Sequence, residues 1–244
     1  MVFTPESAIT GGMHLTADAA AVPLVTKSDV AYLRVRELIL SGELAPGSVL
    51  NQTSLARTIG ISTTPLREAL RRLKQQGLVE LDAHRDARVA PLDAEEARDL
   101  LELRLALDPL AASLAAQRRT TQDIAEMRTA LGGLESLPAD PTAQQLAAHR
   151  RFHAAIYRAS HNARLVTTLD DLWDAADRYR RHGLQTERTA EERAEKAREH
   201  ALLFDAIVEG DDTTAEEVMR THIRTSTGAR AAWRLAAPDA AANQ

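Results

Sequence analysis

The sequence has no cysteine, few aromatic residues and no long hydrophobic run. Without Cys, neither a disulfide framework nor a thiolate zinc site can form in these 244 residues. No apolar run approaches about 18 residues, and residues 1–26 lack the basic start and apolar segment of a signal peptide. We therefore expect a cytoplasmic protein without a membrane-spanning segment. Aromatic residues make up only 3% of the chain, and Ala, Leu, Arg and Glu dominate, which favours helices over a β sandwich.

Charge is distributed unevenly along the chain. The formal net charge of −5 argues against a protein that coats nucleic acid nonspecifically. Residues 26–92 nevertheless carry 10 Lys and Arg against 7 Asp and Glu, whereas the remainder carries 20 against 28. The sequence thus joins a basic segment to an acidic one, and its length allows each to have its own core.

Three short helices are predicted in the basic segment. The first begins after Ser28 as its N-cap and ends before Gly42. The second covers residues 54–59, and the third covers residues 63–76 with Ser62 as its N-cap. A helix, a tight glycine turn and a helix that starts with hydroxyl residues are typical of a helix-turn-helix motif.

Two extended segments, 78–81 and 87–90, follow these helices and are expected to form a β-hairpin wing. In such a unit the start of the third helix enters the major groove of DNA, and the wing lies against phosphates. A plain solvated helix face is the alternative for Arg67, Arg71 and Arg72. The residues predicted to contact DNA are Thr53, Ser62, Thr63, Thr64, Arg67, Arg71, His84 and Arg85.

After Pro91 the sequence predicts helices only, and short connections between them favour an antiparallel all-α bundle of about six helices. The expected fold class is mostly α, with an N-terminal winged helix-turn-helix and a C-terminal helical bundle. The predicted helices cover 93–117, 121–136, 142–160, 162–182, 187–209 and 212–234. The predicted domains are a flexible leader (1–26), a DNA-binding domain (27–92), an all-helical effector, metal-binding and dimerisation domain (93–234) and a tail (235–244).

Four of the eight histidines are predicted to face the interior of this bundle. His149 and His153 are four residues apart and share one helix face, and His200 and His222 lie on apolar stripes of two later helices. A hydrogen-bonded core histidine is the simpler explanation for each one alone. Together they predict a site for a divalent transition metal, with zinc as first choice and nickel or another metal as alternatives.

Residues 28–91 closely resemble the winged helix-turn-helix of GntR-family transcriptional regulators. The similarity lies in LILSGELAPGSVLNQTSLARTIGIS, TPLREALRRLKQQGLVE and the wing. Two positions depart from the family pattern. Thr63 stands where the family usually has arginine, so an expected DNA contact is absent or replaced, and Asp86 stands where the wing tip usually has glycine.

Residues 93–230 resemble the all-helical FCD domain of the FadR-type branch of this family. Metal-binding members have an Asp and a His four apart on one helix and a His on each of two later helices. The resemblance therefore implies metal ligation by His153, His200 and His222, while His149 takes the aspartate position. It also matches Asn162 to a recurrent asparagine.

Three residues are predicted to bind an effector. Arg104 lies on the apolar side of the first long helix in a segment that resembles the family's E-x-R motif, and its guanidinium suits a carboxylate. An internal ion pair with Asp108, one turn later, is the equal alternative. Asn162 and Arg178 complete the predicted effector site.

The resemblance implies a homodimeric regulator, commonly a repressor, that binds a pseudo-palindromic operator and senses a small carboxylate metabolite. A metal-dependent hydrolase or oxygenase is the alternative from another class, since histidines around an open position also describe catalysis. No carboxylate near them is an obvious general base. In a third alternative the metal is purely structural and the helical domain serves dimerisation alone.

Overall fold

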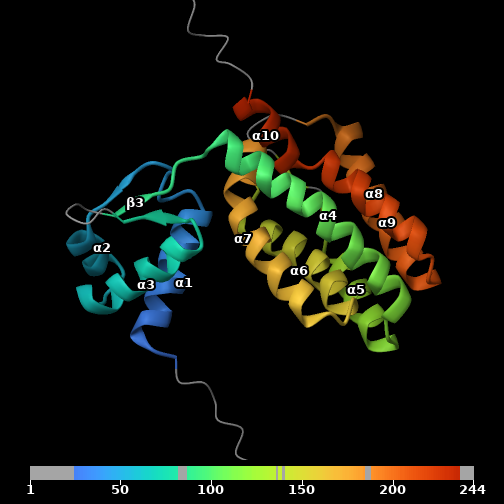
Figure 1. Cartoon of the computed structure of the whole chain (residues 1–244), viewed down its shortest axis with the longest axis horizontal. Helices are drawn as coiled ribbons and strands as arrows, with labels where there is room; N and C mark the ends of the chain where they lie inside the picture. Colours follow the sequence, from blue (N-terminus) through green and yellow to red (C-terminus); the bar gives the residue numbers. More distant parts are fainter. Residues whose placement is uncertain (1–24, 82–86, 136, 139–140, 185–187, 237–244) are drawn as a thin grey trace, which may run out of the picture.

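The computed structural model describes residues 25–81, 87–135, 137–138, 141–184 and 188–236. It shows two groups of elements, one of helices with short strands and a larger one of helices alone (Figure 1). The fold class predicted from the sequence is confirmed. Within the described ranges, no helix combines the length and apolar character needed to cross a membrane.

Three helices and a small antiparallel sheet form the N-terminal group. The sheet has the strand order β1-β3-β2, so the two predicted wing strands pair and the chain before α2 adds a third strand. Leu66, Leu70 and Leu73 of one face of α3 are buried against α1 and the sheet. The elements are α1 (Lys27–Leu40), β1 (Val49–Leu50), α2 (Gln52–Thr58), α3 (Thr63–Gln75), β2 (Val79–Glu80) and β3 (Ala87–Val89).

The N-caps of these helices differ from the prediction at one position. Thr26, not Ser28, caps α1, because the Thr26 side chain accepts the amide of Asp29 while the Asp29 carboxylate accepts the amide of Thr26. This reciprocal capping box satisfies two amides, and Ser28 lies too late in the chain to form it. Asn51 caps α2 in a similar way, through the amide of Ser54.

Seven helices form the C-terminal group of the described chain. The central helix, α4, contacts α6, α7, α8, α9 and α10, and it begins at the predicted cap Asp93 and continues through Pro109 (Figure 1). The helices are α4 (Ala94–Arg118), α5 (Thr121–Gly132), α6 (Ala143–Ala159), α7 (Ala163–Leu184), α8 (Ala190–Glu209), α9 (Asp212–Arg224) and α10 (Thr227–Ala236).

The last predicted helix, 212–234, is broken into α9 and α10. The Ser226 hydroxyl accepts the amide of Ala229 and so starts a new helix, which packs on α4 and α7. The packing is close at Gly183 of α7, where an added Cβ would lie 2.0 Å from the carbonyl oxygen of Thr227. Only glycine allows the two helices to approach this closely.

The two groups of elements are joined by polar contacts of α7. Arg36 of α1 forms an ion pair with Asp174 of α7, and the same carboxylate also pairs with Arg150 of α6. Arg178 of α7 donates to the carbonyl oxygen of Ala90, in the segment between β3 and α4, at 2.9 Å. Helix α7 therefore contacts both the N-terminal group and the helix that carries His149.

Candidate functional site

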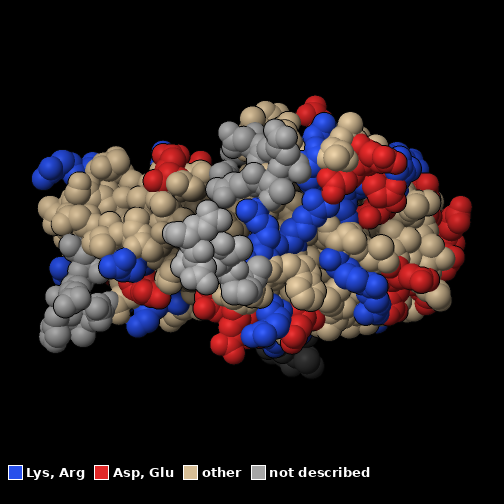
Figure 2. All heavy atoms as spheres, turned by 90° about the horizontal axis from the view of Figure 1, so that it is seen from above, with Lys and Arg blue, Asp and Glu red and all other residues tan. Residues whose placement is uncertain are grey.

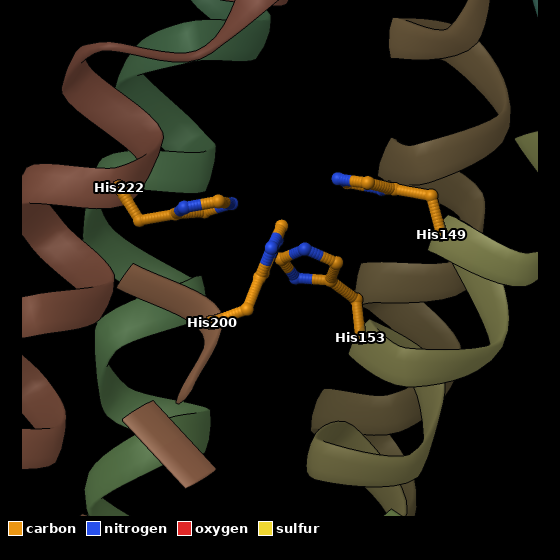
Figure 3. Close-up of side chains that lie close together, drawn as sticks. All are labelled: His149, His153, His200 and His222. Carbon is orange, nitrogen blue, oxygen red and sulfur yellow. The ribbon is translucent and has the colours of Figure 1, made fainter. Parts of the chain in front are cut away.

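Four histidines meet in the interior of the helical group. One ring nitrogen from each of His149, His153, His200 and His222 can be chosen so that all four atoms lie within 4.8 Å of one another. Helix α6 contributes the first two, α8 the third and α9 the fourth (Figure 3). The structure thus brings together the four side chains that the helical spacing predicted on inward faces.

The four imidazoles approach a common point from two sides. His149 and His222 face each other with ring centroids 6.4 Å apart, and the other two rings lie beside this axis (Figure 3). Neighbouring centroids are closer, for example 4.8 Å between His149 and His153 and 4.6 Å between His200 and His222. His149 is partly exposed, whereas the other three side chains are buried.

Several of these ring nitrogens have no hydrogen-bond partner among the described residues. Both nitrogens of His153 and the Nε2 atom of His200 are buried and unpartnered. Leaving buried polar atoms unsatisfied is costly, so such groups usually have a partner. A cation among the rings would satisfy them, and imidazole nitrogen is a favoured ligand of divalent transition metals. The residues present therefore fit a metal ion.

His222 is held in the orientation that a metal ligand needs. Its Nδ1 atom lies 2.7 Å from a carboxylate oxygen of Glu199, so the ring donates its proton there and its Nε2 lone pair faces the cluster. Lys196 binds the same carboxylate at 2.7 Å. Burial alone would raise the pKa of Glu199, but the hydrogen bonds from His222 and Lys196 lower it to about 2. Glu199 is thus an anion that orients His222.

The histidines are neutral at physiological pH. Burial lowers the pKa of each of the four, and neighbouring imidazoles or arginines lower the pKa of His149 and His153 further. The pKa of His200 falls to about 2. Because only the neutral ring offers a lone pair, the cluster is ready to bind a cation without first losing protons.

His149 differs from the other three histidines in its contacts. The Nη2 atom of Arg180 donates to its Nδ1 atom at 3.2 Å. Arginine has no acceptor, so the proton of this neutral ring must be on Nε2. His149 can ligate a metal through Nε2 only if this hydrogen bond with Arg180 breaks.

A cavity of about 730 Å³, counted with its open mouth, adjoins the histidines. Arg104 and Arg180 both line it, and each places its guanidinium 4.9 Å from the ring centroid of Trp173. Its described lining comprises Arg104, Leu131, Leu134, Glu135, Leu137, His149, His153, Trp173, Arg180, Arg188, Arg193, Lys196, Ala197, His200, His222, Ile223, Ser226 and Thr227.

Of the three predicted effector residues, only Arg104 lines this cavity. Arg104 also forms the ion pair with Asp108 at 2.8 Å, so the internal ion pair is present, and effector binding by this residue stays a prediction. The Asn162 side chain accepts the amide of Leu165 at 3.2 Å at the start of α7. Arg178 binds Ala90 and Glu96 and points toward the segment between the two groups of elements. Neither residue reaches the cavity.

The residues predicted to contact DNA gather at the start of α2 and along α3. Thr53, Ser62, Thr64, Arg67 and Arg71 are exposed, and Thr63 is partly exposed. The Nε atom of Arg67 donates to Gln52 at 3.1 Å, and the residue is otherwise exposed. His84 and Arg85 lie outside the described residues.

Arg72 has a different role from its neighbour Arg71. It forms an ion pair with Asp29 at 2.7 Å and its guanidinium lies 4.1 Å from the ring centroid of Tyr32. Arg72 therefore holds α3 against α1.

Sequence reasoning missed several residues of the site. Glu199 orients His222, and Trp173, Lys196 and Arg188 line the cavity. Arg180, like Arg178, lies near Trp173 and Tyr179 in the sequence, and of the two only Arg180 lines the cavity. A sequence signal was present for two of these residues: Trp173 and Arg180 are seven residues apart, which places them on one face of α7.

Two family descriptions match the chain. The FCD domain matches residues 99–225, and "Bacterial regulatory proteins, gntR family" matches residues 27–89. A helix-turn-helix-type transcriptional regulator in an unstable DNA locus of Streptomyces ambofaciens is 31% identical over 195 residues, 79% of this chain and 80% of its own. BphR of Paraburkholderia xenovorans, also a helix-turn-helix-type regulator, is 30% identical over 233 residues, 91% of this chain and 94% of its own.

A solved structure supports the same arrangement of elements. Escherichia coli McbR/YncC aligns with 82% of this chain and 95% of its own at a TM-score of 0.71. Its sequence identity is 24%, so this likeness concerns the fold alone.

Proposed function

The chain belongs to the gntR family of bacterial regulatory proteins and contains an FCD domain, and from this premise we propose that its helical domain binds a divalent metal and a small carboxylate effector that controls operator binding. The observation that carries this proposal is the cluster of four buried or half-buried imidazoles with unpartnered nitrogens beside a basic cavity. The matched domains and relatives are transcription regulators, so the hydrolase or oxygenase alternative is not retained.

We further propose how the chain divides this work. Residues 27–92 would bind DNA, and residues 93–234 would bind the metal and effector and form the dimer. His153, His200 and His222 would hold the ion, with His149 as the fourth ligand once Arg180 releases it. When bound, the ion would supply positive charge for a carboxylate oxygen, and Zn²⁺ is our first candidate and Ni²⁺ the second. Arg104 and Arg180 are placed to orient the acid from the cavity wall.

The proposed dimer uses an exposed apolar surface of α4. Leu103 and Leu110 are 49% and 43% exposed and lie two turns apart on the face opposite Arg104 and Asp108. A twofold dimer would present two copies of α3 to an operator with two related half-sites. Light scattering that gave the mass of a single chain at micromolar concentration would contradict this proposal.

The path from cavity to DNA would run through α7. Trp173 lies against His149 and His153, while the next residue, Asp174, pairs with Arg36 of α1. Effector binding can change DNA affinity only if it favours one arrangement of the two domains over another. Helix α7 has one face in the cavity and another on the DNA-binding group. It can therefore link effector binding to DNA binding.

The proposed function can be tested with the full-length protein and DNA that it selects from a random pool. Fluorescence anisotropy would then measure its affinity for a selected duplex at fixed salt, with Zn²⁺ present and with and without small carboxylic acids. We expect the selected sites to contain an inverted repeat and at least one acid to change the affinity. If chelation unfolded the protein and no acid changed DNA affinity, the purely structural metal would be the correct alternative.

Replacing Arg67 by Ala is expected to weaken binding to the selected duplex by about 5- to 100-fold, the range for one specific contact. The exposed guanidinium of Arg67 lies near the start of α3, the part of the helix expected in the groove. Arg164→Ala removes an exposed arginine from α7 and is the matched control, which should bind as the wild type does. Equal affinity of Arg67→Ala and the wild type would remove Arg67 from the proposed interface.

Replacing Asp174 by Asn is expected to weaken communication between the sites while leaving each site intact. The variant removes the charge that holds Arg36 and Arg150, so the acid-induced change in DNA affinity should fall by roughly 2- to 10-fold. Metal and acid affinities, measured by calorimetry, should stay unchanged. Asp170→Asn is the control, because Asp170 is 3.8 Å from Arg150 and has no ion pair with α1 among the described residues. An unchanged response in Asp174→Asn would exclude this path.

A further inference from the structure

Three of the basic side chains that line the cavity are already neutralised by carboxylates. Each lies within ion-pair distance of an aspartate or glutamate, so its charge is balanced whether or not a ligand is bound. These pairs are Arg104–Asp108 at 2.8 Å, Arg180–Asp177 at 2.7 Å and Lys196–Glu199 at 2.7 Å.

Arg188 lines the same cavity but is not balanced in this way. Its Nη2 atom donates to the neutral carbonyl oxygen of Leu137, and its Nε atom is buried without a partner. In the described part of the chain, Arg188 forms no ion pair with a carboxylate; the nearby Glu192 is bound to Arg230 at 2.9 Å. Among the described residues, Arg188 therefore has a donor without a partner and a positive charge that no ion pair balances.

The surroundings of Arg188 increase this positive charge. Burial lowers its pKa, the neighbouring Arg230 and Arg193 lower it further and Glu192 raises it, and the guanidinium stays charged at neutral pH. Figure 2 shows basic side chains gathered in a band across the face of the helical part that is seen from above. An anion that reaches Arg188 would also meet the positive charges of Arg230 and Arg193.

The histidine cluster supplies a second positive region in the same cavity. All four of its candidate ligands are neutral imidazoles, so no carboxylate in the cluster offsets the charge of a bound divalent ion. A ligand with one carboxylate could balance the cluster or Arg188, but not both.

We infer that the cavity binds a small molecule with two anionic groups, one placed at the histidine cluster and the other on the guanidinium of Arg188. This inference rests on the proposed function, because it names the class of effector for the same site. The planar guanidinium can bind a carboxylate or phosphate through two parallel hydrogen bonds, which would also satisfy the unpartnered Nε atom. Short dicarboxylic acids and phosphorylated carboxylic acids share this chemistry.

The test compares acids that differ only in the second anionic group. Calorimetry with the Zn²⁺-loaded full-length protein would measure the affinities of succinate against butyrate and of glutarate against pentanoate, and a phosphorylated hydroxy acid against its unphosphorylated form. We expect the dianion of at least one pair to bind about 10-fold more tightly or better. In Arg188→Gln, which keeps a polar side chain without the charge, this preference should fall to near one while the affinity of the monocarboxylate stays unchanged.

The other possible results of this calorimetry would contradict the inference. If the wild type bound both members of every pair equally, or if Arg188→Gln weakened both equally, the two-anion class would be wrong while the carboxylate sensor stood. If no acid bound the metal-loaded protein, the proposed function itself would fail with it. Arg198→Gln, which changes an exposed arginine of α8, is the matched control, and thermal unfolding of each variant would report its folding.

Discussion

Replacing His153 by alanine is expected to abolish stable metal binding, with a loss of affinity of at least about 100-fold. His153 is buried, and both of its ring nitrogens lack any other partner in the described chain. Its centroid lies 4.8 to 5.5 Å from those of His149, His200 and His222, so it is close to every other candidate ligand. In the described part of the chain, the group of possible ligands around His153 consists of these four histidines and contains no carboxylate.

Two measurements would check this result. Elemental analysis after dialysis gives the metal content, and calorimetry of the metal-free protein with Zn²⁺ gives the affinity. His182→Ala removes a histidine of α7 that is not in the cluster, and it should retain the metal. Full metal content in His153→Ala would mean that the ion binds elsewhere or that the cluster has no such role.

The metal-free protein is expected to lose several kcal/mol of stability as the pH falls from about 6.5 to 5. The folded-state pKa of each cluster histidine is lowered, that of His200 to about 2, while an unfolded histidine titrates near 6.5. Below pH 6.5 the unfolded chain therefore binds more protons than the folded one, so acid favours unfolding. The cost reaches roughly 1 kcal/mol per pH unit for each histidine that stays neutral in the folded protein over this range.

Urea unfolding followed by circular dichroism, with chelator present, would measure this slope between pH 7.5 and 5. That range separates the histidines from carboxylates such as Glu199, whose contribution is lost only at lower pH because its pKa is lowered to about 2. His200→Gln should reduce the slope by the share of one histidine. Saturating Zn²⁺ should move the acid transition to lower pH, because the ion binds only neutral rings. A stability that did not change over this range would show that the four rings do not stay neutral in the folded protein.

Local signals predicted most of the helices. Asp93, followed by two acidic residues, marks the start of α4, and the structure begins the helix there. The predicted N-cap of α1, Ser28, was wrong. Thr26 and Ser28 are both hydroxyl residues, and only the pairing of Thr26 with Asp29 distinguishes them. The break between α9 and α10 was missed because Ser226 interrupts no apolar pattern; packing of α10 against α4 and α7 decides it.

In the site, too, helical periodicity predicted some residues, whereas contacts between helices decide the others. The four histidines could be predicted because helical periodicity alone places each on an inward face. Glu199 could not, since it precedes His200 directly and a neighbouring residue usually points about 100° away; its partner, His222, comes from another helix. On α7, Arg178 lies five residues after Trp173 and faces the interdomain segment, whereas Arg180, seven residues after Trp173, faces the cavity.

Arg180 and a metal ion would compete for the same imidazole. The guanidinium of Arg180 fixes the proton of His149 on Nε2, the atom through which the ring could reach an ion. An ion bound there would drive that proton to Nδ1, where it would face the guanidinium, and Arg180 would have to turn away. Loading the site would then exchange one cation for another. Arg180 belongs to α7, the helix that contacts the DNA-binding group. Metal binding alone would therefore change a contact of this helix before any acid enters the cavity.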